Sequence, residues 1–158
     1  MKDILDRAIS VAVRVHSGQK DKGDAPYIFH PIRVMMNTDF IRTKNQKVVA
    51  LLHDVIEDSD YSLTQIKWDF SVEIANTLKI LSKPKGEDYM QYIYRLVNSK
   101  DEDAISVKLS DLTDNLDITR VDLESMSDAG RIKFLAKREK YKEAFTLLSS
   151  ALEDIRKG

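Results

Sequence analysis

The sequence predicts an all-α fold, a single-domain helical bundle that covers residues 1–158. Apolar residues recur three or four positions apart through nearly the whole chain, and no stretch alternates as a β-strand would. The length of 158 residues is usual for one domain, and no internal repeat divides it. The chain has no cysteine, which excludes disulfides, thiolate metal sites and cysteine nucleophiles.

The N-terminal third predicts three helices. Residues 4–15 have one apolar face, and a loop rich in Gly, Lys and Asp follows over residues 17–29. We expect His30-Pro31 to open the second helix, because proline is favoured at the first helical position. The core face of a third helix is marked by Val48, Leu51, Leu52 and Val55.

Five more helices are expected toward the C-terminus. Ser62 is expected to cap a short fourth helix that carries Trp68, and a seventh is expected to begin at Asp101. A polar break over residues 122–130 precedes a long last helix. The other apolar faces comprise Ile74, Leu78 and Leu81 in the fifth helix, Tyr89, Tyr92, Ile93 and Leu96 in the sixth, Ile105, Leu109, Leu112 and Leu116 in the seventh, and Tyr141, Ala144, Leu148, Leu152 and Ile155 in the last.

Charge and hydropathy narrow the classes of function. Lys and Arg number 25 and Asp and Glu 26, so the net charge is -1, which argues against a binder of nucleic acid polymers. The first residues are acidic rather than basic and then apolar, unlike a signal peptide. No apolar run approaches the roughly 20 residues of a membrane span. We therefore expect a cytoplasmic protein without a membrane partner.

Residues 53–58, His-Asp-Val-Ile-Glu-Asp, place polar side chains in an otherwise apolar helix. His53 and Glu57 are four residues apart, as are Asp54 and Asp58, so each pair is expected to share a helix face. Burial of such charge requires partners, and a divalent cation is one. The alternative, exposed acids beside a structural histidine, is equally supported by this segment alone.

Two further segments carry ligand-type residues. Lys108, Asp111 and Asn115 lie at positions i, i+3 and i+7 and form a polar stripe beside the apolar line of the seventh helix. A solvated flank would give the same pattern. His30 stands at the start of the second helix, where an isolated histidine is more often structural than a ligand.

Taken in order, four segments resemble the hydrolase domain of RelA/SpoT-type enzymes in its stand-alone form, the small alarmone hydrolase of the HD superfamily. The similarity extends from about Ala8 to Arg120. The HD dipeptide alone is a weak signal, whereas four motifs in order are a strong one. The segments are residues 16–19, 21–31, 53–58 and 108–115.

The resemblance implies a metal-dependent hydrolase that converts the guanosine alarmones ppGpp and pppGpp to GDP or GTP and pyrophosphate. It implies that Glu57 and Asp58 position or deprotonate the attacking water, whose pKa the metal lowers. The metal is usually manganese in that family, although imidazole and carboxylate ligands also suit Fe, Co or Zn. The implied ligands are His30, His53, Asp54 and Asp111.

The resemblance and the charges also suggest residues that contact the nucleotide. Lys22 and Lys20 could bind phosphate or stack near the base, although loop lysines are usually just solvated. Asn115 matches a family position near the nucleotide. Tyr89 and Arg95 belong to a Tyr/Arg pattern in which a guanidinium could bind the 5′ phosphates, although such aromatic residues more often pack in a core.

Some positions leave alternatives open. His16 matches a family histidine and is expected to be structural or to flank the substrate, and Lys108 to support Asp111 or the fold. At Asp21 and Ile118 this chain differs from the residues usual in the long RelA/SpoT enzymes. Both positions are expected to lie near the nucleotide. An adenosine alarmone or NADPH therefore remains an alternative substrate, and a non-catalytic nucleotide sensor and a purely structural bundle are alternative functions. With no room for a synthetase domain, the chain is expected to hydrolyse alarmone and not to make it.

Overall fold

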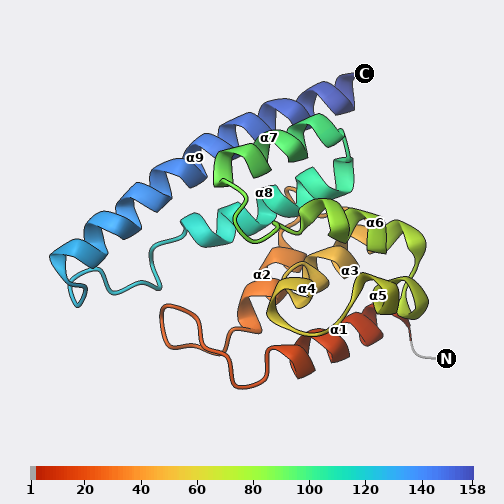
Figure 1. Ribbon diagram of the computed structural model, residues 1–158, viewed down its shortest axis with the longest axis horizontal. Coiled ribbons are helices and arrows are strands. Elements are labelled where there is room, and N and C mark those ends of the chain that lie inside the picture. The colour runs from red at the N-terminus through yellow and green to blue at the C-terminus, as the bar shows by residue number, and fades with distance from the viewer. Residues whose placement is uncertain (1–2) are drawn as a thin grey trace.

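The computed structural model describes residues 3–158, which form nine α-helices joined by loops (Figure 1). These residues contain no β-strand, only an isolated bridge between Lys20 and Pro26, and no helix among them is long and apolar enough to cross a membrane. The predicted all-α fold class is confirmed. The helices are α1 (Ile4–Val15), α2 (Phe29–Met36), α3 (Lys44–Leu52), α4 (Val55–Asp58), α5 (Leu63–Asp69), α6 (Val72–Leu81), α7 (Tyr89–Ser99), α8 (Glu102–Leu116) and α9 (Asp128–Lys157).

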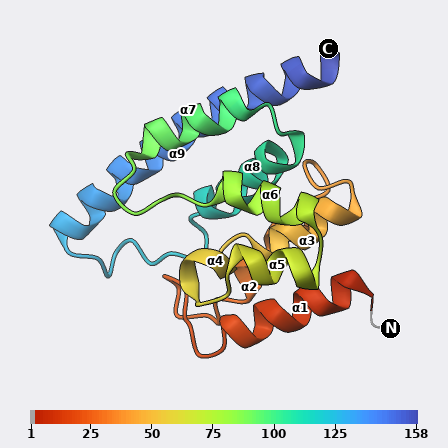
Figure 2. The same cartoon turned by 45° about the vertical axis from the view of Figure 1, so that its right-hand side comes forward.

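Helix α8 lies at the centre of the arrangement. It packs against α2, α3, α6, α7 and α9. The long helix α9 runs along one side with α7 beside it, and α1 to α6 gather on the other side (Figures 1 and 2). Polar side chains on α8 can therefore face the boundary between these two groups of helices.

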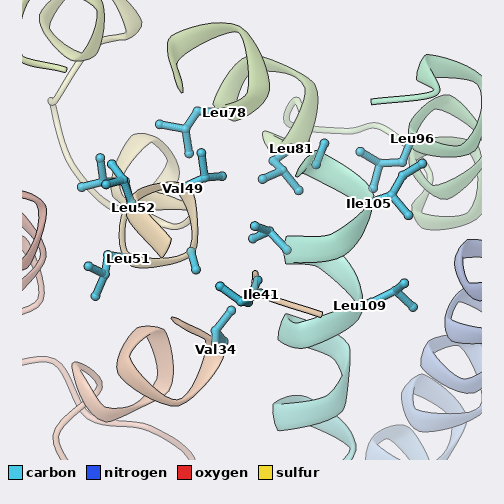
Figure 3. Close-up of a cluster of buried hydrophobic side chains, with 14 of the residues drawn as sticks. Val34, Ile41, Val49, Leu51, Leu52, Leu78, Leu81, Leu96, Ile105 and Leu109 are labelled. Carbon is cyan, nitrogen blue, oxygen red and sulfur yellow. The ribbon is translucent and has the colours of Figure 1, made fainter. Parts of the chain in front are cut away.

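The apolar core fixes the helices that carry the candidate site. Figure 3 shows side chains of α3, α6 and α8 converging on this core, among them Leu52, Leu78 and Leu109. All three are fully buried, and burial of a leucine contributes about 1.5–3 kcal/mol. The backbones of α3 and α8 are thus held in place, and polar residues on these helices have little freedom to move apart.

Side-chain caps begin two helices where the sequence predicts them. The Ser62 hydroxyl accepts a hydrogen bond from the Gln65 N–H at 3.2 Å, and the Gln65 side chain accepts one from the Ser62 N–H at 2.7 Å. Asp101 caps α8 by accepting from the Ala104 N–H at 2.8 Å. The predicted starts of these helices, α5 and α8, are confirmed.

Two other helix starts differ from the prediction. Helix α2 begins at Phe29, so Pro31 is its third residue rather than its first. Proline is tolerated there because the N–H groups of the first turn have no partner within the helix. Helix α9 begins at Asp128, inside the predicted polar break, because the Ser127 hydroxyl caps it by accepting from the Gly130 N–H.

The predicted third helix does not continue through residues 53–58. Helix α3 ends at Leu52, and Val55–Asp58 forms the separate one-turn helix α4. His53 and Asp54 occupy the junction, with torsion angles still in the right-handed helical region. The prediction of one continuous helix is therefore wrong, and both polar residues lie where two helices meet.

The loop between α1 and α2 is fixed against the loop that follows α8. The Asp21 carboxylate accepts from the N–H groups of Gly23 and Ala25 at 2.8 and 3.0 Å, which folds the first loop on itself. A side chain at Gly23 would place its Cβ 2.5 Å from the Arg120 carbonyl oxygen, so only glycine permits this close approach. Both loops contribute to the wall of a cavity in the candidate site.

Candidate active site

The four residues predicted to bind a metal converge between α2, α3 and α8. The Nε2 atoms of His30 and His53 are 3.3 Å apart. Asp111 Oδ1 lies 3.0 Å from His30 Nε2 and 3.6 Å from His53 Nε2. Asp54 Oδ2 lies 3.1 Å from His53 Nε2 and 3.7 Å from His30 Nε2. Three segments that are distant in sequence thus meet at one cluster, here called the His/Asp cluster.

The donor set and the spacing of the His/Asp cluster fit one divalent cation. Imidazole nitrogen and carboxylate oxygen bind such ions at about 2.0–2.2 Å, which places neighbouring ligand atoms roughly 3.0–3.6 Å apart. His30, His53 and Asp54 offer ligand atoms within 4.8 Å of one another, and Asp111 Oδ1 lies beside them. Lone pairs that meet in a buried site repel one another unless a proton or a cation lies between them.

The second ring nitrogen of each histidine is already hydrogen-bonded. His53 Nδ1 lies 2.6 Å from the Ala50 carbonyl oxygen, so this nitrogen carries the proton and donates it. His30 Nδ1 lies 2.7 Å from Asp114 Oδ2 and donates to that carboxylate. With the Nδ1 proton held in this way, each imidazole offers an Nε2 lone pair to the centre once its second proton is lost, as metal-binding histidines usually do.

Charges within the cluster shift its pKa values. Burial alone lowers the pKa of His53, but Asp54 and Asp111 outweigh burial and raise that pKa well above its usual value. Burial also opposes protonation of His30, yet hydrogen bonds to two aspartates raise its pKa. Conversely, burial would raise the pKa of Asp111, but Lys108 and both histidines hold it well below its usual range. Protons and a cation therefore compete for the two imidazoles.

Two residues of the predicted polar stripe on α8 support Asp111. Lys108 Nζ donates to Asp111 Oδ2 at 2.8 Å, and Asn115 Nδ2 donates to Asp111 Oδ1 at 2.9 Å. The largely buried Lys108 ammonium lies 6.0 and 5.4 Å from the ring centres of Tyr89 and Tyr92. Both oxygens of Asp111 are thus oriented by neighbouring donors.

Tyr27 contacts the cluster although it was not among the predicted site residues. Its hydroxyl donates to Asp54 Oδ2 at 2.6 Å, and its ring lies 5.5 Å from that of His30. Burial and the charge of Asp54 raise the pKa of Tyr27, so the phenol keeps its proton. The signal in the sequence is its place three residues before His30, in a segment already matched to the family.

Two cavities adjoin the His/Asp cluster. The first, of about 330 Å³, is lined by His30, and the second, of about 570 Å³, by His53, Asp54 and Asp111. Basic residues outnumber acidic ones in both walls, which suits a phosphorylated ligand. The basic residues are Lys20, Lys22, Arg33, Arg120, Lys137 and Arg138 in the first cavity, and Lys83, Lys108, Lys133, Lys137 and Lys140 in the second.

Four predicted substrate-binding residues line these cavities. Lys20, Lys22 and Asn115 line the first cavity, and Tyr89 lines the second. The exposed Lys20 ammonium donates to a backbone carbonyl of its own loop, whereas Lys22 Nζ lies 5.2 Å from the centre of the Phe134 ring. The Tyr89 hydroxyl is buried and has no hydrogen-bond partner among residues 3–158. Contact of these four residues with a nucleotide stays a prediction.

Arg95, the fifth predicted substrate-binding residue, lines neither of these two cavities. Its guanidinium donates to the carbonyl oxygens of Ile80 and Ser82 at 2.8 and 3.0 Å. It also donates to both carboxylate oxygens of Glu87, at 3.0 Å each. Arg95 therefore links the end of α6 to the loop before α7, and its contact with the 5′ phosphates stays a prediction.

The two predicted catalytic acids have different surroundings. Glu57 lines the second cavity, and its Oε1 accepts from the Lys83 N–H at 2.8 Å. Asp58 lines neither cavity, and its Oδ2 lies 3.8 Å from His16 Nδ1. Burial, and then the charge of Asp54, raise the pKa of Asp58. The structure therefore places Glu57, and not Asp58, on a cavity wall beside the cluster.

His16 is buried outside the set of predicted metal ligands. Its Nδ1 lies 2.9 Å from Gln19 Oε1, and its ring lies 5.0 Å from that of Tyr27. Tyr27 in turn donates a hydrogen bond to Asp54, so Tyr27 connects His16 to the cluster. These contacts favour the structural alternative of the two roles predicted for His16.

Curated proteins resemble much of the chain in sequence. It is 31% identical over 121 residues to a guanosine-3′,5′-bis(diphosphate) 3′-pyrophosphohydrolase of Aquifex aeolicus, and 30% identical over 118 residues to a protein of the same name from Haemophilus influenzae. The matches cover 71% and 67% of this chain and 17% of each relative. The chain therefore spans less than a fifth of the length of these relatives. No family model matches.

A solved structure shares the fold. It is described as a metazoan ortholog of SpoT that hydrolyzes ppGpp and plays a role in starvation responses. The TM-score is 0.71 at 20% sequence identity, over 98% of this chain and 94% of the other. The chain therefore shares the fold of that protein. It resembles the RelA/SpoT-type pyrophosphohydrolases in sequence and the SpoT ortholog in fold, so the predicted resemblance is confirmed.

Proposed function

We propose that the protein hydrolyses the 3′-diphosphate of a guanosine alarmone, ppGpp or pppGpp, and releases pyrophosphate with GDP or GTP. The observation that carries this proposal is the convergence of four ligand atoms beside two cavities whose walls are rich in basic residues. The names of the curated relatives describe the same reaction, which supports this choice of substrate.

In this proposal His30, His53, Asp54 and Asp111 hold one divalent metal ion, most suitably Mn²⁺. Mixed imidazole and carboxylate ligands suit a first-row transition metal. Such an ion would lower the pKa of a bound water and neutralise phosphate charge. The buried carboxylates, whose pKa values are lowered, supply the negative charge that the ion requires.

The side chains around the cluster have different proposed roles in the hydrolysis. A water molecule adds to the phosphorus next to the 3′ oxygen, the bond between these two atoms breaks, and the 3′ oxygen takes up a proton. Glu57, on the wall of the second cavity, is the candidate base for that water. Asp58, the other acid of the pair, is a candidate to supply the proton that the 3′ oxygen takes up, since burial and Asp54 raise its pKa. The proposed nucleotide contacts are Lys22, Lys20 and Asn115 in the first cavity and Tyr89 in the second.

The test is a pyrophosphate-release assay with ppGpp, run with Mn²⁺ and with a chelator, for the wild type and Asp54→Ala. We expect Mn²⁺-dependent release that the substitution abolishes while the circular dichroism stays helical. No release from folded, Mn²⁺-loaded wild type would refute the proposed substrate. Parallel assays with an adenosine alarmone and with NADPH would then identify the preferred base and phosphate.

A further inference from the structure

We infer that Asp114 is a positioning residue that holds His30 in the tautomer and orientation needed to bind the metal. Asp114 lies within the segment 108–115 that resembles the family, yet no role follows for it from that resemblance. In the structure its Oδ2 lies 2.7 Å from His30 Nδ1, although the two residues are 84 positions apart. The inference rests on the metal site of the proposed function.

Two arginines fix the Asp114 carboxylate. Arg33 donates through Nε to Oδ1 at 2.6 Å and through Nη2 to Oδ2 at 3.0 Å, a two-pronged contact that sets the plane of the carboxylate. Arg120 Nη2 donates to Oδ1 at 3.2 Å. The Asp114 side chain is 9% exposed, so solvent competes little for these contacts. Arg33 also follows His30 by one turn of α2, so this clamp and the metal ligand belong to one rigid helix.

The chemistry of the carboxylate decides the tautomer of His30. An ionised carboxylate accepts hydrogen bonds and cannot donate them, so the proton of the neutral imidazole must reside on Nδ1. Nε2, which faces His53 and Asp111, then carries the lone pair. Hydrogen bonds of this kind to metal-binding histidines change metal affinity by about 10–100-fold when they are removed.

The two histidines differ in what orients them. His53 Nδ1 is held by the backbone carbonyl of Ala50, which no side-chain substitution removes. His30 depends on a side chain from another helix. A substitution at Asp114 should therefore perturb one ligand of the cluster and leave the other unchanged.

Asp117 supplies a matched control. Its Oδ2 accepts from Arg120 Nη1 at 2.9 Å, and it lines the same cavity as Asp114, but its carboxylate makes no hydrogen bond to His30 in the described residues. Asp117→Asn removes the same charge from the same wall. Asp114→Asn also keeps the side-chain shape, but its amide can turn its NH₂ toward Nδ1 and place the imidazole proton on Nε2.

The experiment is calorimetric titration of the metal-free protein with Mn²⁺ alone. We expect the Kd of Asp114→Asn to be about 10–100-fold weaker than that of the wild type, and the Kd of Asp117→Asn to stay within about twofold. Thermal unfolding without metal checks that both variants are folded. An Asp114→Asn protein that binds Mn²⁺ with wild-type affinity, or an equal loss in Asp117→Asn, would overturn the inference.

A second variant covers the case in which Asp114→Asn does not fold. Arg33→Lys keeps the positive charge but cannot make the two-pronged contact, so we expect a smaller, several-fold loss of Mn²⁺ affinity. If Arg33→Lys binds Mn²⁺ as tightly as the wild type, the contact between Arg33 and Asp114 does not contribute to metal binding and the inference is refuted. Because the readout is metal binding, it is separate from turnover: a wild type that binds Mn²⁺ but does not release pyrophosphate refutes the proposed substrate and leaves the role of Asp114 standing.

Discussion

The His/Asp cluster and the cluster around Arg95 are both built from partly buried charged residues, but their internal chemistry differs. Around Arg95, guanidinium donors meet carbonyl and carboxylate acceptors, so polar groups at the end of α6 and in the loop before α7 are paired with this side chain. In the His/Asp cluster, two imidazole nitrogens and two carboxylate oxygens meet one another at 3.0–3.7 Å. These atoms complement one another only while the imidazoles hold additional protons, and a cation can take the place of those protons.

The largest effect should follow from Asp111→Ala, which breaks the His/Asp cluster itself. The substitution removes one metal ligand and leaves the buried Lys108 ammonium without its partner. We expect Mn²⁺ binding to be lost and the free energy of unfolding to fall by about 3–5 kcal/mol. Urea denaturation of the metal-free protein and calorimetry measure the two effects. Lys108→Met added to Asp111→Ala should restore stability but not metal binding, and restored metal binding would contradict the ligand assignment.

Glu57→Gln should separate chemistry from metal binding within the same region. The amide keeps the size of the side chain but cannot accept a proton from water. We expect kcat for pyrophosphate release to fall by about 10²–10⁴-fold, with Mn²⁺ affinity close to that of the wild type. Steady-state kinetics with ppGpp gives the rate. An unchanged kcat would show that the base is another residue, and Asp58 would be tested next.

Arg95→Ala, in the cluster around Arg95, should lower stability and leave the reaction with ppGpp unchanged. The carbonyl oxygens of Ile80 and Ser82 lose their donor, so we expect the free energy of unfolding to fall by about 1–3 kcal/mol. KM for ppGpp should stay unchanged, because Arg95 lines neither cavity. Chemical denaturation and steady-state kinetics check this. A raised KM at unchanged stability would instead support the predicted contact of Arg95 with the 5′ phosphates.

The smallest expected effect is a dependence of metal binding on pH. It concerns only the His/Asp cluster, whose histidines can lose a proton. The folded metal-free protein raises the pKa of His30 and His53 above 6.5, so their protonation stabilises it below that pH, and this contribution is lost as the pH rises through the raised values. Mn²⁺ must displace those protons and therefore binds more tightly at higher pH.

The resulting prediction is a difference between two melting temperatures. The Tm with Mn²⁺ minus the Tm with a chelator should widen from about pH 6 to about pH 8, because metal binding stabilises the native state more as protons compete less. Differential scanning fluorimetry at a fixed Mn²⁺ concentration measures both. A difference that stays constant or narrows over this range would mean that the two imidazoles do not bind the ion.

Local sequence determined most of the secondary structure and the composition of the cluster. Apolar periodicity predicted the helices, and the capping residues Ser62 and Asp101 fixed two of the starts, because a cap is a hydrogen bond within three residues. Family-like segments indicated His53, Asp54 and Asp111 as ligands, and these side chains do meet in the fold. The helices and their caps depend on the immediate neighbours of each residue, whereas the ligands were indicated by the resemblance of short segments to a family.

Only the tertiary structure decided what surrounds those ligands. Asp114 reaches His30 across 84 residues, and Tyr27 reaches Asp54 across 27. Arg95, for which the sequence suggested a phosphate contact, finds its acceptors at the end of α6 and in the loop before its own helix. Helix periodicity places a residue on a face, but which donors and acceptors that face meets depends on how α2, α3 and α8 pack, and packing is a property of the whole chain.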